Sequence, residues 1–334
     1  MEKARLQLAE FVGCGPGEIV FTSGATESNN LIFLSLLLDA KEKRRKIAVS
    51  AIEHKSVLLP AKNLGTRGFD LTLLPVTSNG IVDINVARKL ITEDTALVSV
   101  HTANNEIGTI QPVKELAEIA HRVGAKFHTD AAQALGKMPF DAQQLDCDLA
   151  SFSSHKIYGP KGIGALYIRG GSRKWPWDYP LYGGGQESGI RPGTHNVPAI
   201  VGFGEACDIM SLNCSHFLRK LSSLTQAFEK LLSAQHSPFL IHCQESPRIG
   251  GLSSIYLNSP KAELILEHLS GVAISKASAC NSSSLEKSHV IQAINSDYSL
   301  SDKTIRVSFG LETDDSNVAD LFNDLMNSVQ VIHK

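Results

Sequence analysis

The lysine in the run SSHKIYGPKG is the residue best suited to covalent chemistry. Lys156 follows the apolar run 149–152 and stands beside His155, with Ser153 just before them. Ligands of open α/β sheets bind beyond the carboxyl ends of the strands. A loop lysine is ordinarily a solvated charge. At the end of a buried strand, burial lowers the pKa of an amine and frees the nucleophile, so Lys156 is a candidate Schiff-base lysine.

An acid and an amide follow another apolar run. The run 125–128 leads into HTDAAQ, which places Asp130 and Gln133 just beyond it. An acid there fits a helix cap, a metal ligand or a partner for a cationic ring. Because no second carboxylate or histidine stands at convincing ligand spacing, the sequence argues against a metal site.

The segment FTSGATESNN opens into an apolar helix predicted over 31–38. Small residues at a helix start, such as Ala25 and Thr26, expose backbone N–H groups that suit a phosphate. The plain alternative is a turn glycine with Ser23 or Thr26 as an N-cap.

The elements that would position these residues alternate between strand and helix up to about residue 170. An amphipathic segment over 113–123 lies between two of the apolar runs. This alternation predicts an α/β fold with a mostly parallel central sheet and helices on both faces. The predicted strands are 47–52, 71–76, 96–100, 125–128, 149–152 and 164–168.

A Gly- and Pro-rich stretch over 176–198 and a helix over 200–232 follow the sheet. We expect a large domain over residues 1–205 and a smaller α+β domain over residues 206–334. The 334 residues exceed what one hydrophobic core usually supports, which agrees with two domains.

Net charge, cysteine spacing and the lack of long apolar runs limit the partners and the cellular compartment that we expect. The formal net charge of −2 gives no reason to expect nucleic acid or an anionic membrane. The six cysteines form neither a C-x-x-C pair nor a cluster at zinc spacing, which is typical of reduced thiols. Without a signal peptide or an apolar run of membrane length, we expect a cytoplasmic protein that does not enter a membrane.

Seven runs together resemble the cysteine desulfurases, the class-V branch of aminotransferase-like enzymes. They occur in the family's order and spacing, from about Leu6 to Leu321: TSGATESNN, AIEHKS, HTANNEIGTIQP, HTDAAQALGK, SSHKIYGPKG, GGGQESGIRPGT and SACNSSSLEKSHV. Each run alone is weak or moderate, but seven in register identify the family.

The resemblance implies pyridoxal 5′-phosphate (PLP) as cofactor, in the PLP-dependent transferase fold of type I. Lys156 would bind the cofactor covalently and Asp130 would face its pyridine nitrogen. His54 would stack on the ring, and Gln133 would donate to the phenolate oxygen. The phosphate would be bound by Ala25, Thr26, Ser153 and His155, with Thr194 reaching the phosphate of the neighbouring subunit of a homodimer.

The same resemblance implies the substrate and the reaction. Asn105 and Arg306 would hold the carboxylate of L-cysteine, and Cys280 would take its sulfur as a persulfide, leaving L-alanine. His54 is one candidate base for the Cys280 thiol. The sulfur would pass to an acceptor or scaffold protein, for iron–sulfur clusters or thio-modification.

Two features set this chain apart and keep alternatives open. The Asn- and Thr-rich segment that precedes these motifs in the family has no counterpart in the printed sequence, and Lys276 and Ala277 replace the usual serine and glycine before Cys280. One alternative is a selenocysteine lyase with the same fold. Another is a PLP-fold protein or truncated isoform with impaired catalysis.

Overall fold

The structure is a computed structural model that describes residues 1–234, 237–257, 264–265, 269, 274–276, 287–297 and 299–332. It contains two compact units. The first comprises Met1–Pro75, Val82–Ala103 and Gln111–Cys214. The second comprises Val76–Ile81, Asn104–Ile110 and Ser215–Lys334.

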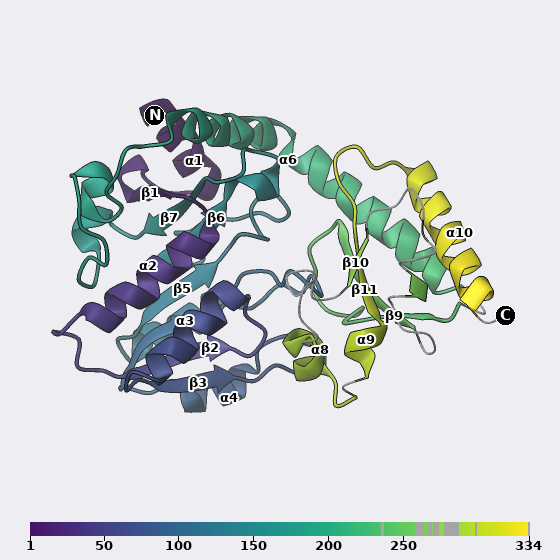
Figure 1. Ribbon diagram of the computed structural model, residues 1–334, viewed down its shortest axis with the longest axis horizontal. Helices are drawn as coiled ribbons and strands as arrows, with labels where there is room; N and C mark the ends of the chain where they lie inside the picture. The colour runs from purple at the N-terminus through teal and green to yellow at the C-terminus, as the bar shows by residue number, and fades with distance from the viewer. Residues whose placement is uncertain are drawn as a thin grey trace. The chain divides into compact units, whose positions relative to one another are not determined.

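A seven-stranded sheet forms the centre of the first unit (Figure 1). Its strand order is β1-β7-β6-β5-β4-β2-β3. The strands β2 to β6 run parallel to one another, and β7 runs antiparallel to both of its neighbours, β6 and β1. The mostly parallel sheet predicted from the sequence is therefore confirmed. The strands are β1 (Ile19–Thr22), β2 (Lys46–Ser50), β3 (Asp70–Leu74), β4 (Thr95–Ser99), β5 (Lys126–Asp130), β6 (Leu149–Ser153) and β7 (Gly164–Ile168).

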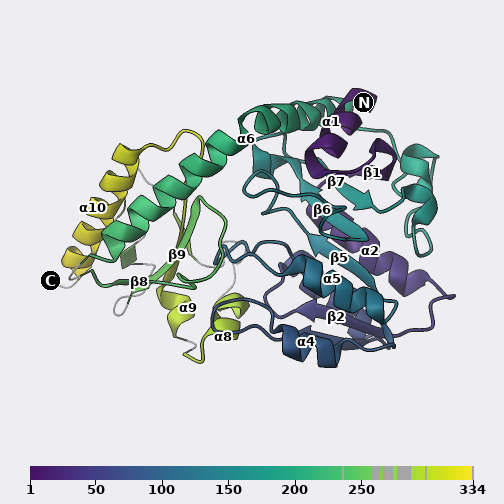
Figure 2. The ribbon, with the colours of Figure 1, turned by 180° about the vertical axis from the view of Figure 1, so that it is seen from behind.

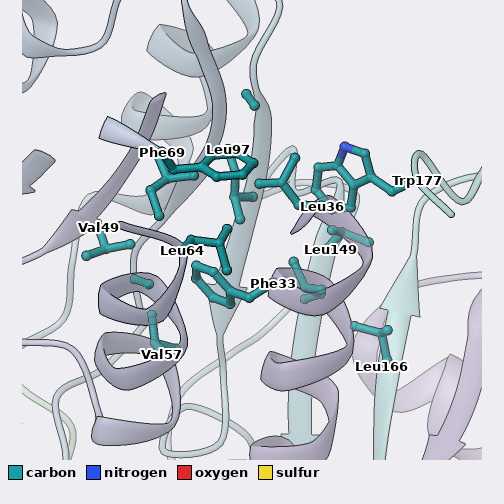
Figure 3. Packing of buried hydrophobic residues seen from close by; sticks show 14 of the residues in the cluster. Phe33, Leu36, Val49, Val57, Leu64, Phe69, Leu97, Leu149, Leu166 and Trp177 are labelled. Carbon is teal, nitrogen blue, oxygen red and sulfur yellow. The ribbon is translucent and has the colours of Figure 1, made fainter. Parts of the chain in front are cut away.

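Helices cover both faces of this sheet. Helices α2 (Ala25–Leu38) and α3 (Lys55–Gly65) lie on one face, and α5 (Val113–Arg122) lies on the other, as the opposite views show (Figures 1 and 2). Buried side chains of α2 and α3, such as Phe33 and Leu64, pack on sheet residues such as Leu97 (Figure 3). The unit also contains α1 (Glu2–Val12), α4 (Ile84–Leu90) and short 3₁₀ turns at Pro16–Glu18, Ser154–Ile157, Ser172–Lys174 and Gln186–Gly189.

The second unit has a four-stranded antiparallel sheet in the order β10-β11-β9-β8. Helix α6 (Val197–Leu232) begins in the first unit and ends in the second. Its Phe228 ring meets Phe309 edge to face, with the ring centroids 5.5 Å apart. The remaining elements are β8 (Phe239–Ile241), β9 (Leu252–Leu257), β10 (Ser275–Lys276), α8 (His289–Ile294), α9 (Leu300–Lys303), β11 (Thr304–Ser308) and α10 (Asp315–Ile332).

No helix among the described residues combines the length and the apolar character that a membrane crossing needs.

Candidate active site

The carboxyl ends of the parallel strands bring the predicted cofactor residues to one edge of the sheet. Asp130 is the last residue of β5, and it pairs with Ser151 of the neighbouring strand β6. Lys156 lies in the 3₁₀ turn that directly follows β6. His54 follows β2 and begins helix α3 as its N-cap. An acid, an amine and an imidazole thus leave the same edge, as open α/β sheets arrange their ligand sites.

Asp130 is held by two donors on two different elements. Its side chain is buried, with the residue only 6% exposed. The backbone N–H of Ala132 donates to Oδ1 at 3.0 Å, and the amide nitrogen of Asn29 donates to Oδ2 at 2.8 Å. These two hydrogen bonds fix the orientation of the Asp130 carboxyl group. The arrangement suits an acid that must meet a protonated ring nitrogen.

The start of helix α2 is joined to the end of β6. The backbone N–H of Ala25 donates to the Ser153 hydroxyl at 2.9 Å, and the N-cap residue Gly24 gives the helix no side-chain cap. A Cβ on Gly164 of β7 would lie 2.5 Å from the Cα of Gly24, so only glycine allows this approach. The N-terminus of α2 therefore lies directly beside Ser153, where both can face an anion.

His54 is bound on its Nδ1 side. Ser56 donates its backbone N–H to Nδ1 at 3.1 Å, and the Ser56 hydroxyl oxygen lies 2.7 Å from the same nitrogen. A hollow of about 480 Å³ runs between α2 and α3 as far as Asn63 and Leu64, and both Thr26 and His54 line it. Thr26 is exposed and His54 is half-buried. Two residues that the sequence predicted to meet the cofactor thus line one hollow.

The turn after β6 exposes His155 and half-buries Lys156. His155 is exposed, but the neighbouring backbone partly desolvates its ring and lowers its pKa, and the positive charges of Lys156 and Lys161 lower it further. His155 is therefore neutral near pH 7 and can donate one hydrogen bond. Gln133 is also half-buried, and its carbonyl oxygen accepts a hydrogen bond from Lys137 at 2.7 Å. The cofactor contacts predicted for His155 and Gln133 stay predictions.

Thr194 lies on an exposed loop whose flanks are fixed by side-chain hydrogen bonds. Arg191 bonds Glu27 in the first turn of α2 at 2.8 Å, and His195 bonds the buried Glu187 at 2.7 Å. Thr194 itself is exposed between these two anchors. The loop can therefore present Thr194 outward in a defined conformation.

The predicted substrate residues Asn105 and Arg306 meet in the second unit. Arg306 of β11 donates from Nη1 to the backbone carbonyl of Asn105 at 2.8 Å. Next to Asn105, the buried Glu106 accepts a hydrogen bond from the Ser288 hydroxyl at 2.5 Å. Arg306 is thus anchored through one nitrogen of its guanidinium fork. Cys280, the predicted sulfur acceptor, lies outside the described residues.

The other five cysteines are free thiols. Burial raises the pKa of Cys14 and of Cys147 to about 12 and that of Cys243 to about 11. Burial likewise raises the pKa of Cys207. These four thiols stay protonated near neutral pH, whereas a sulfur nucleophile must be a thiolate.

Sequence reasoning missed Asn29 and Ser56, which connect the predicted site residues. Asn29 stands one helical turn after Ala25 and one turn before Ile32 and Phe33, and like them it is buried. A polar residue within the apolar face of a helix is the signal that could have identified it. The partner of Asn29 in β5 is distant in the sequence and gives no local pattern.

PLP fits the residues present at this edge. A carboxylate, an amine and a helix N-terminus match its ring nitrogen, its aldehyde and its phosphate. Two buried atoms beside these groups, Asn29 Oδ1 and Ser154 Oγ, have no hydrogen-bond partner among the described residues. Polar atoms of this kind suit a site that binds a polar ligand.

Comparisons with known proteins identify the family of the chain. The family model for class-V aminotransferases matches residues 1–321. The mitochondrial cysteine desulfurase of Candida albicans is 39% identical over 100% of this chain and 68% of its own length. The cysteine desulfurase IscS of Dictyoglomus turgidum is 41% identical over 94% of this chain and 79% of its own length.

Solved structures agree as well. A NifS-like protein superposes with a TM-score of 0.90 at 34% identity, covering 99% of this chain and 87% of its own. The NifS-like protein of Rickettsia africae superposes with a TM-score of 0.86 at 28% identity, covering 98% of this chain and 87% of its own. The chain therefore belongs to the class-V aminotransferase family, and within it to the PLP-dependent cysteine desulfurases.

Proposed function

We propose that this chain converts L-cysteine to L-alanine and transfers the sulfur to Cys280 as a persulfide. The observation that carries the proposal is the placement of Asp130, which is buried and bound by two donors at the end of the strand beside the one leading to Lys156. Family membership supplies the reaction class, and this geometry supports the residue roles.

The residues of the first unit would hold the cofactor. Lys156 would bind its aldehyde, Asp130 would keep the ring nitrogen protonated, and Ser153 with the start of α2 would bind the phosphate. When bound, PLP withdraws electrons from the α-carbon of an amino acid. Asp130 serves this chemistry because an ionised carboxylate stabilises the positive charge on the ring nitrogen.

Arg306 and Asn105 would hold the substrate carboxylate. A guanidinium has five N–H donors in a planar fork, and the bond from Nη1 to the Asn105 carbonyl engages one of them. That bond fixes the plane of the fork, and the other donors suit a bidentate contact with a carboxylate.

Cys280 would perform the sulfur transfer as a thiolate. Its sulfur attacks the sulfur of the bound cysteine, so that an S–S bond forms while the Cβ–S bond breaks. The electron pair of the broken bond stays with the carbon, which takes up a proton to become the methyl group of alanine. Cys280 is oxidised to the persulfide, and the substrate carbon is reduced. An acceptor or scaffold protein would then receive the sulfur.

The oligomeric state and the compartment belong to the same proposal. The exposed Thr194, with its flanks fixed by Glu27 and Glu187, supports a homodimer in which Thr194 binds the phosphate of the partner subunit. Cytoplasmic placement rests on the sequence, and cell fractionation tests it. Two relatives carry organelle names, the mitochondrial one above and a mitosomal cysteine desulfurase of Encephalitozoon cuniculi.

Alanine release tests the proposed reaction. We expect PLP-loaded protein to release alanine from L-cysteine, and Lys156→Ala to lose at least about 100-fold of that rate together with the absorbance of lysine-bound cofactor. L-Selenocysteine serves as the comparison substrate. Turnover of selenocysteine alone would contradict the proposal and identify a selenocysteine lyase. Bound cofactor without turnover of either amino acid would favour impaired catalysis.

A further inference from the structure

A chain of three hydrogen bonds joins Asp130 to His54 across the first unit. The amide nitrogen of Asn29 lies 2.8 Å from Oδ2 of Asp130 and 2.8 Å from the hydroxyl oxygen of Ser56. That hydroxyl oxygen lies 2.7 Å from Nδ1 of His54. Asn29 is fully buried in α2, and Ser56 is buried in the first turn of α3. The chain therefore connects the two side chains proposed to contact the cofactor ring.

The donors in this chain can be assigned without ambiguity. An ionised carboxylate only accepts hydrogen bonds, so Asn29 must face Asp130 with its NH₂ group. The two hydrogens of that group are used by Asp130 and by Ser56. Because the Ser56 oxygen accepts one of them, its own hydrogen points to Nδ1 of His54. The backbone N–H of Ser56 also donates to Nδ1, at 3.1 Å, and a backbone N–H can only donate.

We infer that Asn29 and Ser56 are positioning residues that hold His54 as a neutral imidazole with its hydrogen on Nε2. The inference rests on the proposed function and assigns a direction to His54 within it. A ring nitrogen that carries the hydrogen donates, so His54 gives a hydrogen bond to the reacting groups through Nε2. In this tautomer His54 does not remove a proton from the Cys280 thiol. Another group must therefore serve as that base.

The burial of Asn29 supports a role beyond packing. Its Oδ1 atom has no hydrogen-bond partner among the described residues. Burying an unpaired acceptor costs stability, and an apolar side chain in the same place would avoid that cost. The charge of Asp130 also polarises the amide and strengthens the next bond of the chain.

The tautomer can be read directly in protein labelled with ¹⁵N at histidine. Long-range ¹H–¹⁵N correlation distinguishes a protonated from an unprotonated ring nitrogen, and His54→Gln identifies the His54 signals by their loss. We expect an unprotonated Nδ1 and a protonated Nε2 in both cofactor-free and PLP-loaded protein. A hydrogen on Nδ1, or on both nitrogens, at pH 7 to 8 would overturn the inference.

Variants test whether Ser56 and Asn29 act on His54. Ser56→Ala removes the hydroxyl bond to Nδ1 and Asn29→Leu weakens it, while the Ser56 backbone N–H still donates to Nδ1. Each variant should therefore change the Nδ1 chemical shift and lower kcat by about 10-fold, with a smaller change in KM. Ser56→Thr keeps the hydroxyl and should restore both. Ser35→Ala removes another buried hydroxyl of α2 and should change neither. Unchanged His54 signals in Ser56→Ala and Asn29→Leu would contradict the positioning role.

The labelling experiment on cofactor-free protein does not depend on turnover. If the tautomer is wrong while alanine is still released, the inference fails and the proposed function stands. If alanine release fails while the tautomer is as stated, the hydrogen-bond chain is correct and the proposed reaction is wrong.

Discussion

The carboxylate of Glu187 accepts two parallel hydrogen bonds from the guanidinium of Arg5, at 2.8 and 2.9 Å. The backbone N–H of Phe21 and the ring of His195 complete the set, at 2.9 and 2.7 Å. Glu187 adopts the left-handed φ of 49°, which is unfavourable for a residue with a side chain. Its four contacts offset that cost and fix the loop that carries Thr194 to α1 and β1.

Replacing Glu187 should therefore destabilise the fold. Glu187→Gln leaves the Arg5 guanidinium, only 13% exposed, without its ionised partner. Breaking a buried ion pair from one side costs about 3 kcal/mol of unfolding free energy, measurable by urea titration. Glu2→Gln is the control, because Glu2 also pairs with Arg5 but is 82% exposed and should cost less than about 1 kcal/mol. Equal losses in the two variants would refute the assignment.

Strand β7 lies so close to the start of α2 that position 164 should tolerate only glycine. In Gly164→Ala the new Cβ would overlap the Gly24 Cα and the Phe152 carbonyl, so the cradle for the phosphate must shift. We expect a loss of about 1–3 kcal/mol in stability and weaker PLP binding, measured by thermal melting and cofactor titration. In the control Gly17→Ala, a Cβ meets nothing within 4 Å. Normal cofactor affinity in Gly164→Ala would show that the phosphate does not bind at Ser153 and the start of α2.

The buried ring of His128 should make the folded protein less stable as the pH falls. Its ring is fully buried between the hydroxyls of Ser99 and Ser151, and burial lowers its pKa to about 4. The unfolded chain binds the proton more readily, so the stabilising contribution is present above the unfolded pKa of about 6.5 and is lost as pH falls through about 4. The loss amounts to about 3 kcal/mol in urea titrations. In His128→Asn the unfolding free energy should fall less steeply between about pH 6.5 and pH 4. An unchanged fall would show that His128 does not cause it.

His121 should give the unfolding free energy the opposite dependence on pH. Its hydrogen bond to Asp148 raises its pKa, burial opposes the rise, and the charges of Asp148 and Asp146 add to it. The folded state then binds the proton more tightly, so the contribution is full below about pH 6.5 and is lost as pH rises through the raised pKa. His121→Asn should remove the decline in stability on the alkaline side of pH 6.5. If wild type shows no such decline, the ion pairs contribute nothing measurable.

The sequence predicted the strands of the central sheet because each is a short apolar run bounded by polar residues or glycine. The predicted run 149–152 became β6 at Leu149–Ser153, and 164–168 became β7 at its expected bounds. Helix α2 begins at Ala25, well before the predicted start at residue 31. Its first turns are small and polar, and their burial against the sheet, not their hydrophobic spacing, makes them helical.

Contacts between distant segments were beyond the reach of local patterns. Strand β1 is only four residues long, and it is defined by antiparallel pairing with β7 far along the chain. The segments Val76–Ile81 and Asn104–Ile110 join the second unit although their neighbours in sequence belong to the first. The hydrogen bonds of Arg5 with Glu187 and of Asn29 with Asp130 could not be predicted for the same reason. Each joins residues that come together only in the folded chain.

The most direct test of the account is the mass of the intact protein after it meets its substrate. PLP-loaded protein incubated with L-cysteine, without reductant, should gain one sulfur atom, and Cys280→Ser should bind the cofactor normally and gain none. A persulfide that still forms in Cys280→Ser, or a wild-type protein that releases alanine without gaining sulfur at Cys280, would contradict the central claim.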